Sequence, residues 1–176
     1  PVFFGNDMSK GKVLLVGTSY GAMHMLLRLK KMGYSVSVCG GIESDPCHQH
    51  ADESYYVDYS GKESLLELCK ENIFDYIVPT CNDYSYNSAS YVSTKMDKYF
   101  GFDNYSVTNI LHEKELFRQF TLENNLPAPR SISKDNPAVN KFSDLPFPIL
   151  VKPNDSFSGK GVTQVFSKDK VKTAID

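Results

Sequence analysis

Short apolar runs alternate with amphipathic stretches along the first hundred residues. Apolar side chains at Ala22, Met25, Leu26 and Leu29 recur with the period of a helix that buries one face. Runs such as Lys12-Val-Leu-Leu-Val-Gly17 are short and continuous and end in a turn residue, which favours buried parallel strands. The predicted strands are residues 12–17, 34–39, 55–57 and 75–79, and the predicted helices are residues 22–33, 62–71 and 84–96. This alternation predicts βαβ units and an α/β fold with an open, mostly parallel, doubly wound sheet.

The pattern changes after residue 105. A predicted helix at 112–123 has an apolar side made of Leu116, Phe117 and Phe120. It is followed by an extended segment at 130–133, a short helix at 137–142, a strand at 149–152, a polar loop at 154–161, a returning strand at 162–166 and a last helix from Ser167. We therefore expect two domains: an α/β domain over residues 1–105 and the opening part of an α+β domain over residues 106–176.

Composition and charge narrow the class of protein. The chain has 176 residues, of which 41% are hydrophobic, and 19 Lys and Arg against 21 Asp and Glu give a net charge of −2. This apolar content argues against disorder, and the charge argues against a basic nucleic-acid platform. No apolar run approaches the roughly 18 residues that cross a bilayer, and the first residues do not resemble a signal peptide. We expect a cytoplasmic protein that binds neither nucleic acid nor membranes.

The cysteines predict reduced thiols rather than a disulfide framework. Cys39, Cys47, Cys69 and Cys81 form no Cys-x-x-Cys pair. The stretch Cys47-His48-Gln49-His50 crowds several candidate metal ligands together, but a zinc site needs convergent ligands and no partner cluster is evident elsewhere in the sequence. We therefore predict a polar surface loop at 47–50 and no metal site within this chain.

The first glycine loop, Gly17-Thr-Ser-Tyr-Gly21-Ala22, follows a predicted strand and opens a helix, which is the context of a dinucleotide-binding fingerprint. However, Ser19 replaces the middle glycine, and the second strand ends in Gly40-Gly41 rather than in an acidic residue that could bind a ribose. The helix N-terminus could still bind a small anion such as a substrate carboxylate, with Gly17, Ser19 and Gly21 as candidate residues. A plain tight turn between strand and helix is the alternative.

Asn82 follows the fourth predicted strand at its carboxyl end, where open α/β sheets bind ligands. It is a candidate substrate-binding residue. An Asn-Asp pair at this point is also ordinary helix-capping chemistry, so both interpretations stay open.

The second glycine loop joins two predicted antiparallel strands. Lys152 ends the first strand, and Ser156-Phe-Ser158-Gly159-Lys160-Gly161 precedes the second. This is not a Walker A loop, because it lacks the Gly-Lys-Ser/Thr ending and the helix that follows. A lysine at a strand end and a Ser/Gly loop could fold over phosphates as a lid and donate backbone N–H groups. The alternative is a plain hairpin with a solvated lysine.

The order of motifs around this loop carries a family resemblance. Lys114 opens a helix, Asn125-Leu-Pro-Ala-Pro129 leaves it, and Pro146-Phe-Pro-Ile-Leu-Val-Lys152-Pro153 leads into the Ser/Gly loop that ends in Gly161-Val. Together with the preceding α/β domain, this order resembles the ATP-grasp superfamily where its pre-ATP-grasp domain joins its nucleotide-binding domain. The carbamoyl-phosphate-synthase-like and biotin-carboxylase-like branch is the most similar, and the resemblance spans nearly the whole chain.

The resemblance implies an ATP-dependent ligase for small-molecule carboxylate and amine substrates. Lys114 and Lys152 would approach the ATP phosphates, and the loop from Ser156 to Gly161 would cover them, with Lys160 either a third contact or a solvated side chain. A carboxylate would attack the γ-phosphate to give an acyl phosphate, which the amine then displaces, while lysines and Mg²⁺ neutralise charge on the phosphates. Members of this family often form dimers, so a homodimer is also possible.

Two departures from the family pattern bear on this expectation. Glu113 stands where the family more often has an aspartate before the lysine. The family's Mg²⁺ ligands and adenine clamp follow the lid, so we expect them beyond residue 176 and expect this chain to be an N-terminal portion that is inactive alone. The competing hypotheses are a non-catalytic α/β module that binds a nucleotide or small ligand, and an NAD-dependent oxidoreductase.

Overall fold

The computed structural model describes residues 10–133, 146–153 and 159–175. The chain divides into two compact units, Pro1–Asn109 and Ile110–Asp176.

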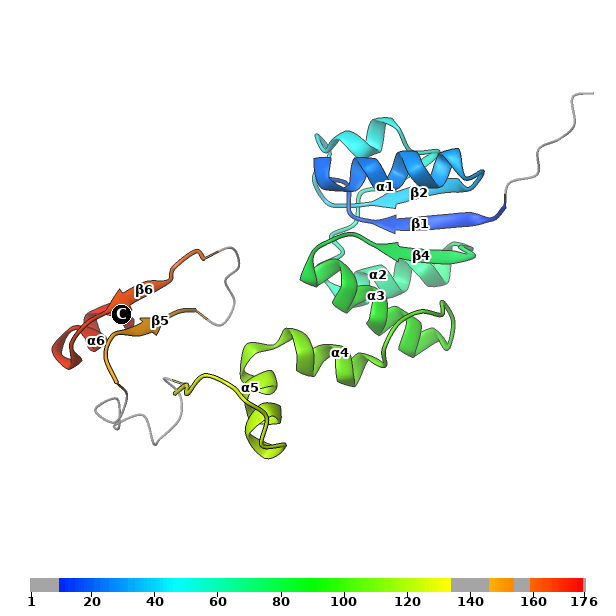
Figure 1. Cartoon of the computed structure of the whole chain (residues 1–176). Helices are drawn as coiled ribbons and strands as arrows, with labels where there is room; N and C mark the ends of the chain where they lie inside the picture. Colours follow the sequence, from blue (N-terminus) through cyan, green and yellow to red (C-terminus); the bar gives the residue numbers. More distant parts are fainter. Residues whose placement is uncertain (1–9, 134–145, 154–158, 176) are drawn as a thin grey trace, which may run out of the picture. The chain divides into compact units, whose positions relative to one another are not determined.

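The first unit is built on a four-stranded parallel sheet (Figure 1). Its strands are β1 (Lys12–Val16), β2 (Ser35–Cys39), β3 (Glu53–Tyr55) and β4 (Tyr76–Pro79), in the order β3-β2-β1-β4. The order reverses between β1 and β4, which gives the sheet the topological switch point where open α/β sheets bind ligands. The predicted open, parallel, doubly wound sheet is confirmed.

Two cores cover the two faces of this sheet. Because side chains alternate along a strand, Leu14 and Val16 of β1 enter one core while Leu15 enters the other. The helices α2 (Lys62–Glu71) and α3 (Asp83–Met96) pack on the Leu14 side, and α1 (Tyr20–Lys31) with the short 3-10 helix η1 (Pro46–Gln49) packs on the Leu15 side (Figure 1). The sheet is therefore buried on both faces, which is why its strands read as continuous apolar runs.

The third strand and the fifth helix of the chain differ from the sequence prediction. Strand β3 covers Glu53–Tyr55 rather than residues 55–57, since Glu53, Ser54 and Tyr55 pair in register with β2. The predicted helix at 112–123 is α5 (Lys114–Glu123), and an additional helix, α4 (Tyr105–His112), precedes it. Helix α4 was not predicted, because its buried residue, Thr108, is polar and adds no apolar position to the helical pattern. The Thr108 hydroxyl lies 2.9 Å from the hydroxyl of Ser90 on α3.

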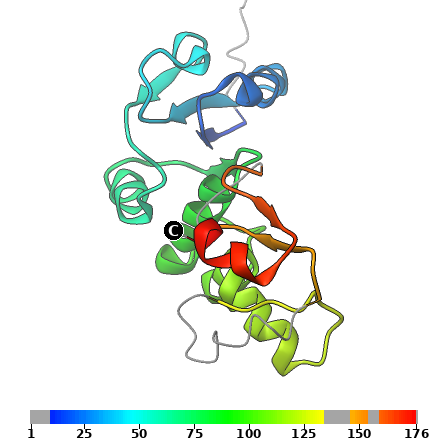
Figure 2. The same ribbon diagram turned by 90° about the vertical axis from the view of Figure 1, so that its left-hand side faces the viewer.

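The second unit contains α5 and a two-stranded antiparallel hairpin. Strand β5 (Ile149–Val151) pairs with β6 (Thr163–Val165), and Leu150 faces Gln164 in the register. A short 3-10 helix, η3 (Lys168–Lys170), leads into α6 (Val171–Ile175), which packs beside the hairpin (Figure 2). Val165 and Val171 are the buried anchors of that packing. The helix predicted at 137–142 lies outside the described residues.

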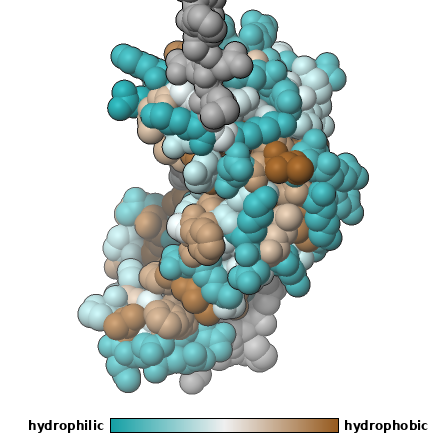
Figure 3. Space-filling model, turned by 90° about the vertical axis from the view of Figure 1, so that its right-hand side faces the viewer, coloured by the Kyte–Doolittle hydropathy of each residue, from teal (hydrophilic) through white to brown (hydrophobic). Residues whose placement is uncertain are grey.

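Hydrophilic side chains predominate on the face shown in Figure 3, with smaller apolar groups between them. Single exposed apolar residues such as Ile73 and Tyr76 are normal for a protein surface. Among the described helices, none combines the length and the apolar character needed to cross a membrane.

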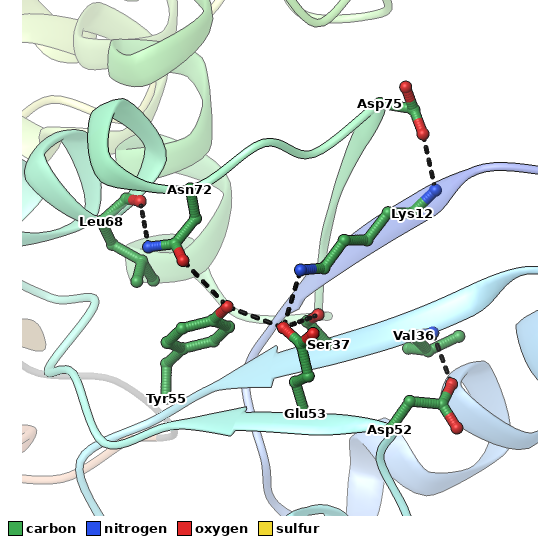
Figure 4. A network of polar contacts seen from close by, with 9 residues as sticks. All are labelled: Lys12, Val36, Ser37, Asp52, Glu53, Tyr55, Leu68, Asn72 and Asp75. Atoms are coloured by element: carbon green, nitrogen blue, oxygen red, sulfur yellow. Dashed lines mark hydrogen bonds and ion pairs between the residues drawn. The ribbon is translucent and has the colours of Figure 1, made fainter.

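A polar network joins β1, β2 and β3 to the end of α2 (Figure 4). The Glu53 carboxylate accepts from Lys12 Nζ at 2.7 Å and from the Tyr55 hydroxyl at 2.7 Å. Both bonds favour the ionised carboxylate, so they lower the pKa of Glu53, and the bond between Lys12 and Glu53 also raises the pKa of Lys12.

Asp52 lies next to this network and accepts from Lys30 Nζ at 2.6 Å and from Val36 N–H at 2.8 Å. Partial burial acts to raise the pKa of Asp52, but these two bonds outweigh it and lower the pKa.

At the carboxyl ends of the strands, two glycines lie in close contact with threonine side chains. Gly17 has φ +127° and lies directly against the side chain of Thr80, and Gly40 lies directly against the side chain of Thr18. A Cβ at either glycine would overlap the neighbouring threonine side chain. Gly41 differs, because the nearest atom to a Cβ there would be Cα of Asp58 at 3.6 Å, an ordinary contact distance.

We predict that acid weakens the first unit through Glu53 and Asp52. Their pKa values are lower in the folded chain than in the unfolded chain, so these carboxylates stabilise the fold above about pH 4. This stabilisation is lost as the pH falls through the lowered folded-state values. Urea unfolding followed by circular dichroism should show a smaller difference between neutral pH and about pH 3 in Glu53→Gln than in the unmodified chain. Because the side chains of Lys12 and Glu53 are 29% and 49% exposed, we expect the change to stay below about 1 kcal/mol.

The matched control is Glu67→Gln, which removes an exposed carboxylate of α2. An equal pH dependence in Glu53→Gln and in the unmodified chain would contradict the assignment of this stabilisation to Glu53.

We predict that Gly40→Ala lowers the free energy of unfolding by about 1–3 kcal/mol, because the new methyl group overpacks against Thr18. Gly41→Ala, the neighbouring control, should change it by less than about 0.5 kcal/mol. The double variant Gly40→Ala with Thr18→Ala should lose less stability than the two single losses combined, since it removes the clashing atoms. Urea unfolding of the unmodified chain, Gly40→Ala, Thr18→Ala and the double variant measures this coupling. Strict additivity of the two losses would show that the contact between Gly40 and Thr18 does not cause the loss of stability in Gly40→Ala.

Candidate functional site

The neck of the β5–β6 hairpin is a tight contact between Pro153 and Gly161. Gly161 has φ +71°, and a Cβ there would lie 2.8 Å from Cγ of Pro153. The position therefore requires glycine both for its backbone conformation and for its packing. Lys152 stands at this neck, at the carboxyl end of β5, and its side chain is exposed.

Lys114 ties α5 to the same neck. It is the first residue of α5, and its Nζ donates a hydrogen bond to the carbonyl oxygen of Pro153 at 3.3 Å. Since Pro153 directly follows Lys152, this bond brings the two lysines predicted to approach phosphates to the same place in the second unit.

Two neighbouring cavities lie beside the neck. The larger, of about 850 Å³, is bounded by β5 and the segment at 129–133, and the smaller, of about 240 Å³, is bounded by α5 and that segment. Arg118, Pro129, Ser131 and Lys152 line both. The larger volume falls within the range of about 300–1,000 Å³ that is common for small-molecule sites.

The cavities are basic. Lys114, Arg118, Arg130 and Lys152 line one or both of them, and no acidic side chain is among the described lining residues. Several cationic side chains that line one cavity suit a phosphate or carboxylate ligand and not a metal ion. Across the described parts of the chain, no group of three or more His, Cys, Asp or Glu side chains could hold a metal ion.

Sequence reasoning missed Arg118 and Arg130. Arg118 follows Lys114 by four residues, so the helical period places the two side chains on the same face of α5. This spacing was available as a signal in the sequence. Arg130 offered none, because its place depends on how the segment after Pro129 runs beside β5.

The predicted lid is described only in part. Ser156 and Ser158 lie outside the described residues. Gly159, Lys160 and Gly161 form a turn, in which Gly159 has φ +75° and Gly161 lines the larger cavity. Gly159 and Lys160 are not among the residues that line either cavity, and their contact with phosphate stays a prediction.

At the sheet of the first unit, Asn82 is a helix cap. It is the N-cap residue of α3, and its Oδ1 accepts from Ser85 N–H at 2.9 Å. Its Nδ2 donates to Thr80 Oγ1 at 2.9 Å, and Thr80 Oγ1 donates to the carbonyl oxygen of Val16 at 2.8 Å. The capping interpretation is confirmed, and the amide already has protein partners on both of its polar atoms. A role for Asn82 in binding substrate stays a prediction.

The first glycine loop is built mainly for packing. Gly17 is held under Thr80, and Ser19 is the N-cap residue of α1 but makes no side-chain capping bond. Thr18 Oγ1 donates to the Asp45 carboxylate at 2.6 Å. A carboxylate fixed beside this turn opposes the approach of a second anion. The Asp45 carboxylate thus weighs against the predicted anion contacts of Gly17, Ser19 and Gly21, which stay a prediction.

The stretch at 47–50, predicted as a polar surface loop, lies in and just after the 3-10 helix η1, and only Gln49 and His50 in it are exposed. Cys47 lies in η1 and is buried, and its backbone N–H donates to the carbonyl oxygen of Thr18 at 3.1 Å. Burial raises the pKa of the Cys39 thiol and raises that of Cys69 to about 12, so both behave as small apolar side chains. All four cysteines are free thiols.

Proteins similar to this chain were found both by sequence and by structure. No family model matches it. It is 26% identical over 179 residues to a formate-dependent phosphoribosylglycinamide formyltransferase from Rhodococcus jostii, across 99% of this chain and 44% of that protein. An enzyme of the same name from Methanocaldococcus jannaschii is also 26% identical, across 97% of this chain and 44% of its own length.

A solved structure with the same fold is N5-carboxyaminoimidazole synthetase from Staphylococcus aureus in complex with ADP. It matches with a TM-score of 0.74 and 19% identity, across 95% of this chain and 44% of that one. The chain thus spans less than half the length of these proteins. The likeness extends over nearly the whole chain and therefore over both units. The homologues and structural neighbours of the chain are ATP-grasp enzymes.

Proposed function

We propose that this chain supplies the phosphate-binding part of an ATP-dependent carboxylate–amine ligase. The observation that carries the proposal is the bond from Lys114 Nζ to the carbonyl oxygen of Pro153, which holds Lys114 beside Lys152 at the edge of a basic cavity. A nucleoside triphosphate is the polyanion that ligases of this superfamily use. The ADP bound in the similar Staphylococcus aureus structure supports a nucleotide as the ligand.

Each described residue has a distinct part in this proposal. Lys152 and Lys114 hold positive charge against the phosphates and stabilise the charge that develops during transfer. The turn at 159–161 places backbone N–H groups near them, since glycine allows a close approach. Ser156 and Ser158, which lie outside the described residues, are further phosphate-binding residues in this proposal, as is Lys160.

The proposed reaction activates a carboxylate. A carboxylate oxygen attacks the γ-phosphorus of ATP, the bond to the β-phosphate oxygen breaks, and an acyl phosphate and ADP form. The amine then attacks the acyl carbon and displaces inorganic phosphate. The names of the sequence relatives fit this class, because formate is a carboxylate and glycinamide carries an amine. Formate and phosphoribosylglycinamide are therefore the first substrates to test.

Mg²⁺ would neutralise phosphate charge when bound, and the basic lining of the described cavities does not fit it. We propose that the Mg²⁺ ligands lie outside this chain, which spans only 44% of the Rhodococcus jostii relative.

We also propose that residues 1–105 form the pre-ATP-grasp domain and residues 106–176 the first part of the ATP-grasp domain. The free thiols fit a reducing cytoplasm.

We predict that Lys152→Ala weakens ATP binding by the 176-residue chain about tenfold or more, because a hydrogen bond to a charged group contributes about 1.5–3 kcal/mol. Titration with a fluorescent ATP analogue measures the affinity. Lys152→Arg should retain part of it. The matched control is Lys168→Ala, an exposed lysine of η3 in the same unit that lines neither cavity.

Equal affinity in Lys152→Ala and in the unmodified chain would remove Lys152 from the site. In the intact enzyme, ADP release that depends on formate and phosphoribosylglycinamide would support the ligase. Nucleotide binding with no release for any carboxylate–amine pair would indicate a binding module instead.

A further inference from the structure

Arg118 is the one side chain of α5 that borders both cavities of the second unit together with Lys152. It stands one helical turn after Lys114, and it is half-buried. Neither the motifs in the sequence nor the proposed roles of Lys114 and Lys152 account for it.

The helix presents a single stripe to the smaller cavity. Lys114, Phe117, Arg118 and Thr121 line it, at the i, i+3, i+4 and i+7 positions of one helix face. Thr121 is buried at the end of the stripe, and its Oγ1 donates to the carbonyl oxygen of Arg118 at 2.7 Å. The backbone of Arg118 is thus fixed by the helix and by Thr121. The Cα of Arg118 is therefore held in place, and its side chain lines the smaller cavity together with Lys114, Pro129 and Ser131.

The chemistry of the guanidinium differs from that of the two lysines. An arginine offers a planar fork of donors that can bind two oxygens of one phosphate at once, whereas a lysine acts as a point charge. Within the described residues, no protein group accepts a hydrogen bond from the Arg118 guanidinium. Ser131 lines both cavities with it and adds a hydroxyl donor.

Arg130 is a weaker candidate for the same role. It lines only the larger cavity, it is exposed, and it stands in a segment without regular structure. Arg118 borders both cavities, is half-buried and belongs to a helix. A site on a helix holds its ligand more precisely than a site on a loop.

We propose that Arg118 is a further phosphate-binding residue, which binds two oxygens of the same polyphosphate that Lys114 and Lys152 contact. This inference rests on the proposed function, since it assigns a further residue to the same nucleotide. It adds a requirement for the planar guanidinium fork at position 118, whereas the two lysines need supply only charge. A positive charge without the fork is not sufficient for full phosphate affinity.

Isothermal titration of the 176-residue chain with inorganic tripolyphosphate and with ATP tests the proposal. We expect Arg118→Ala to weaken binding of both probes about tenfold, because the contact is to phosphate and not to the nucleoside. Arg118→Lys keeps the charge but not the fork, and should recover less than half of the lost binding free energy. The matched control is Arg28→Ala, which removes an exposed arginine from α1 in the first unit.

The outcomes separate this inference from the proposed function. If Lys152→Ala weakens binding and Arg118→Ala does not, or if Arg118→Ala has no more effect than Arg28→Ala, the role of Arg118 is overturned while the nucleotide site stands. If Arg118→Lys binds as tightly as the unmodified chain, the bidentate contact is overturned. If the unmodified chain binds neither probe, the proposed function itself fails. A circular dichroism melt that matches the unmodified chain shows that each variant is folded.

Discussion

The hydrogen bond from Lys114 Nζ to the carbonyl oxygen of Pro153 is the interaction on which the candidate site depends. It joins the first turn of α5 to the end of β5, two elements that are 39 residues apart in the chain. The contact of Gly161 with Pro153 closes the hairpin at the same point. Together these contacts concentrate positive charge at one neck, and the basic cavities lie directly beside it.

The two glycine loops show how similar motifs can serve different purposes. In the first unit, Gly17 and Gly40 allow Thr80 and Thr18 to approach the strand ends. The polar groups around them, including Asn82, bond one another, and the Asp45 carboxylate adds negative charge. In the second unit, Gly161 packs on Pro153 and opens onto a cavity lined by cations. The first loop therefore stabilises the sheet, and the second is the loop that we propose to bind phosphate.

Local patterns in the sequence predicted most of the first unit. The period of apolar residues predicted α2 with its observed bounds and β1 to within one residue, because these elements bury a regular face. Helix α4 was missed, since its buried residue is the polar Thr108. The position of β3 was wrong by two residues, because pairing with β2 and not side-chain character sets it. Burial of Cys47 was also missed, as it follows from tertiary packing.

The candidate site was predictable only through the resemblance. No spacing rule relates Lys114 to Lys152, because they meet through the carbonyl of Pro153 and not through one element. Arg118 could have been found from its helical position once Lys114 was chosen. Arg130 and the two cavities depend on the path of the chain after α5, which apolar periodicity does not encode.

We propose that phosphate binds at the hairpin neck of the second unit and not at the first glycine loop. Hydrogen–deuterium exchange of the 176-residue chain, with and without ATP and with and without NAD, tests it directly. We expect ATP to slow exchange in peptides that cover residues 114–121 and 149–153 and to leave residues 17–22 unchanged. We expect NAD to protect neither region. Protection of residues 17–22 by either nucleotide, with residues 149–153 unaffected, would contradict it.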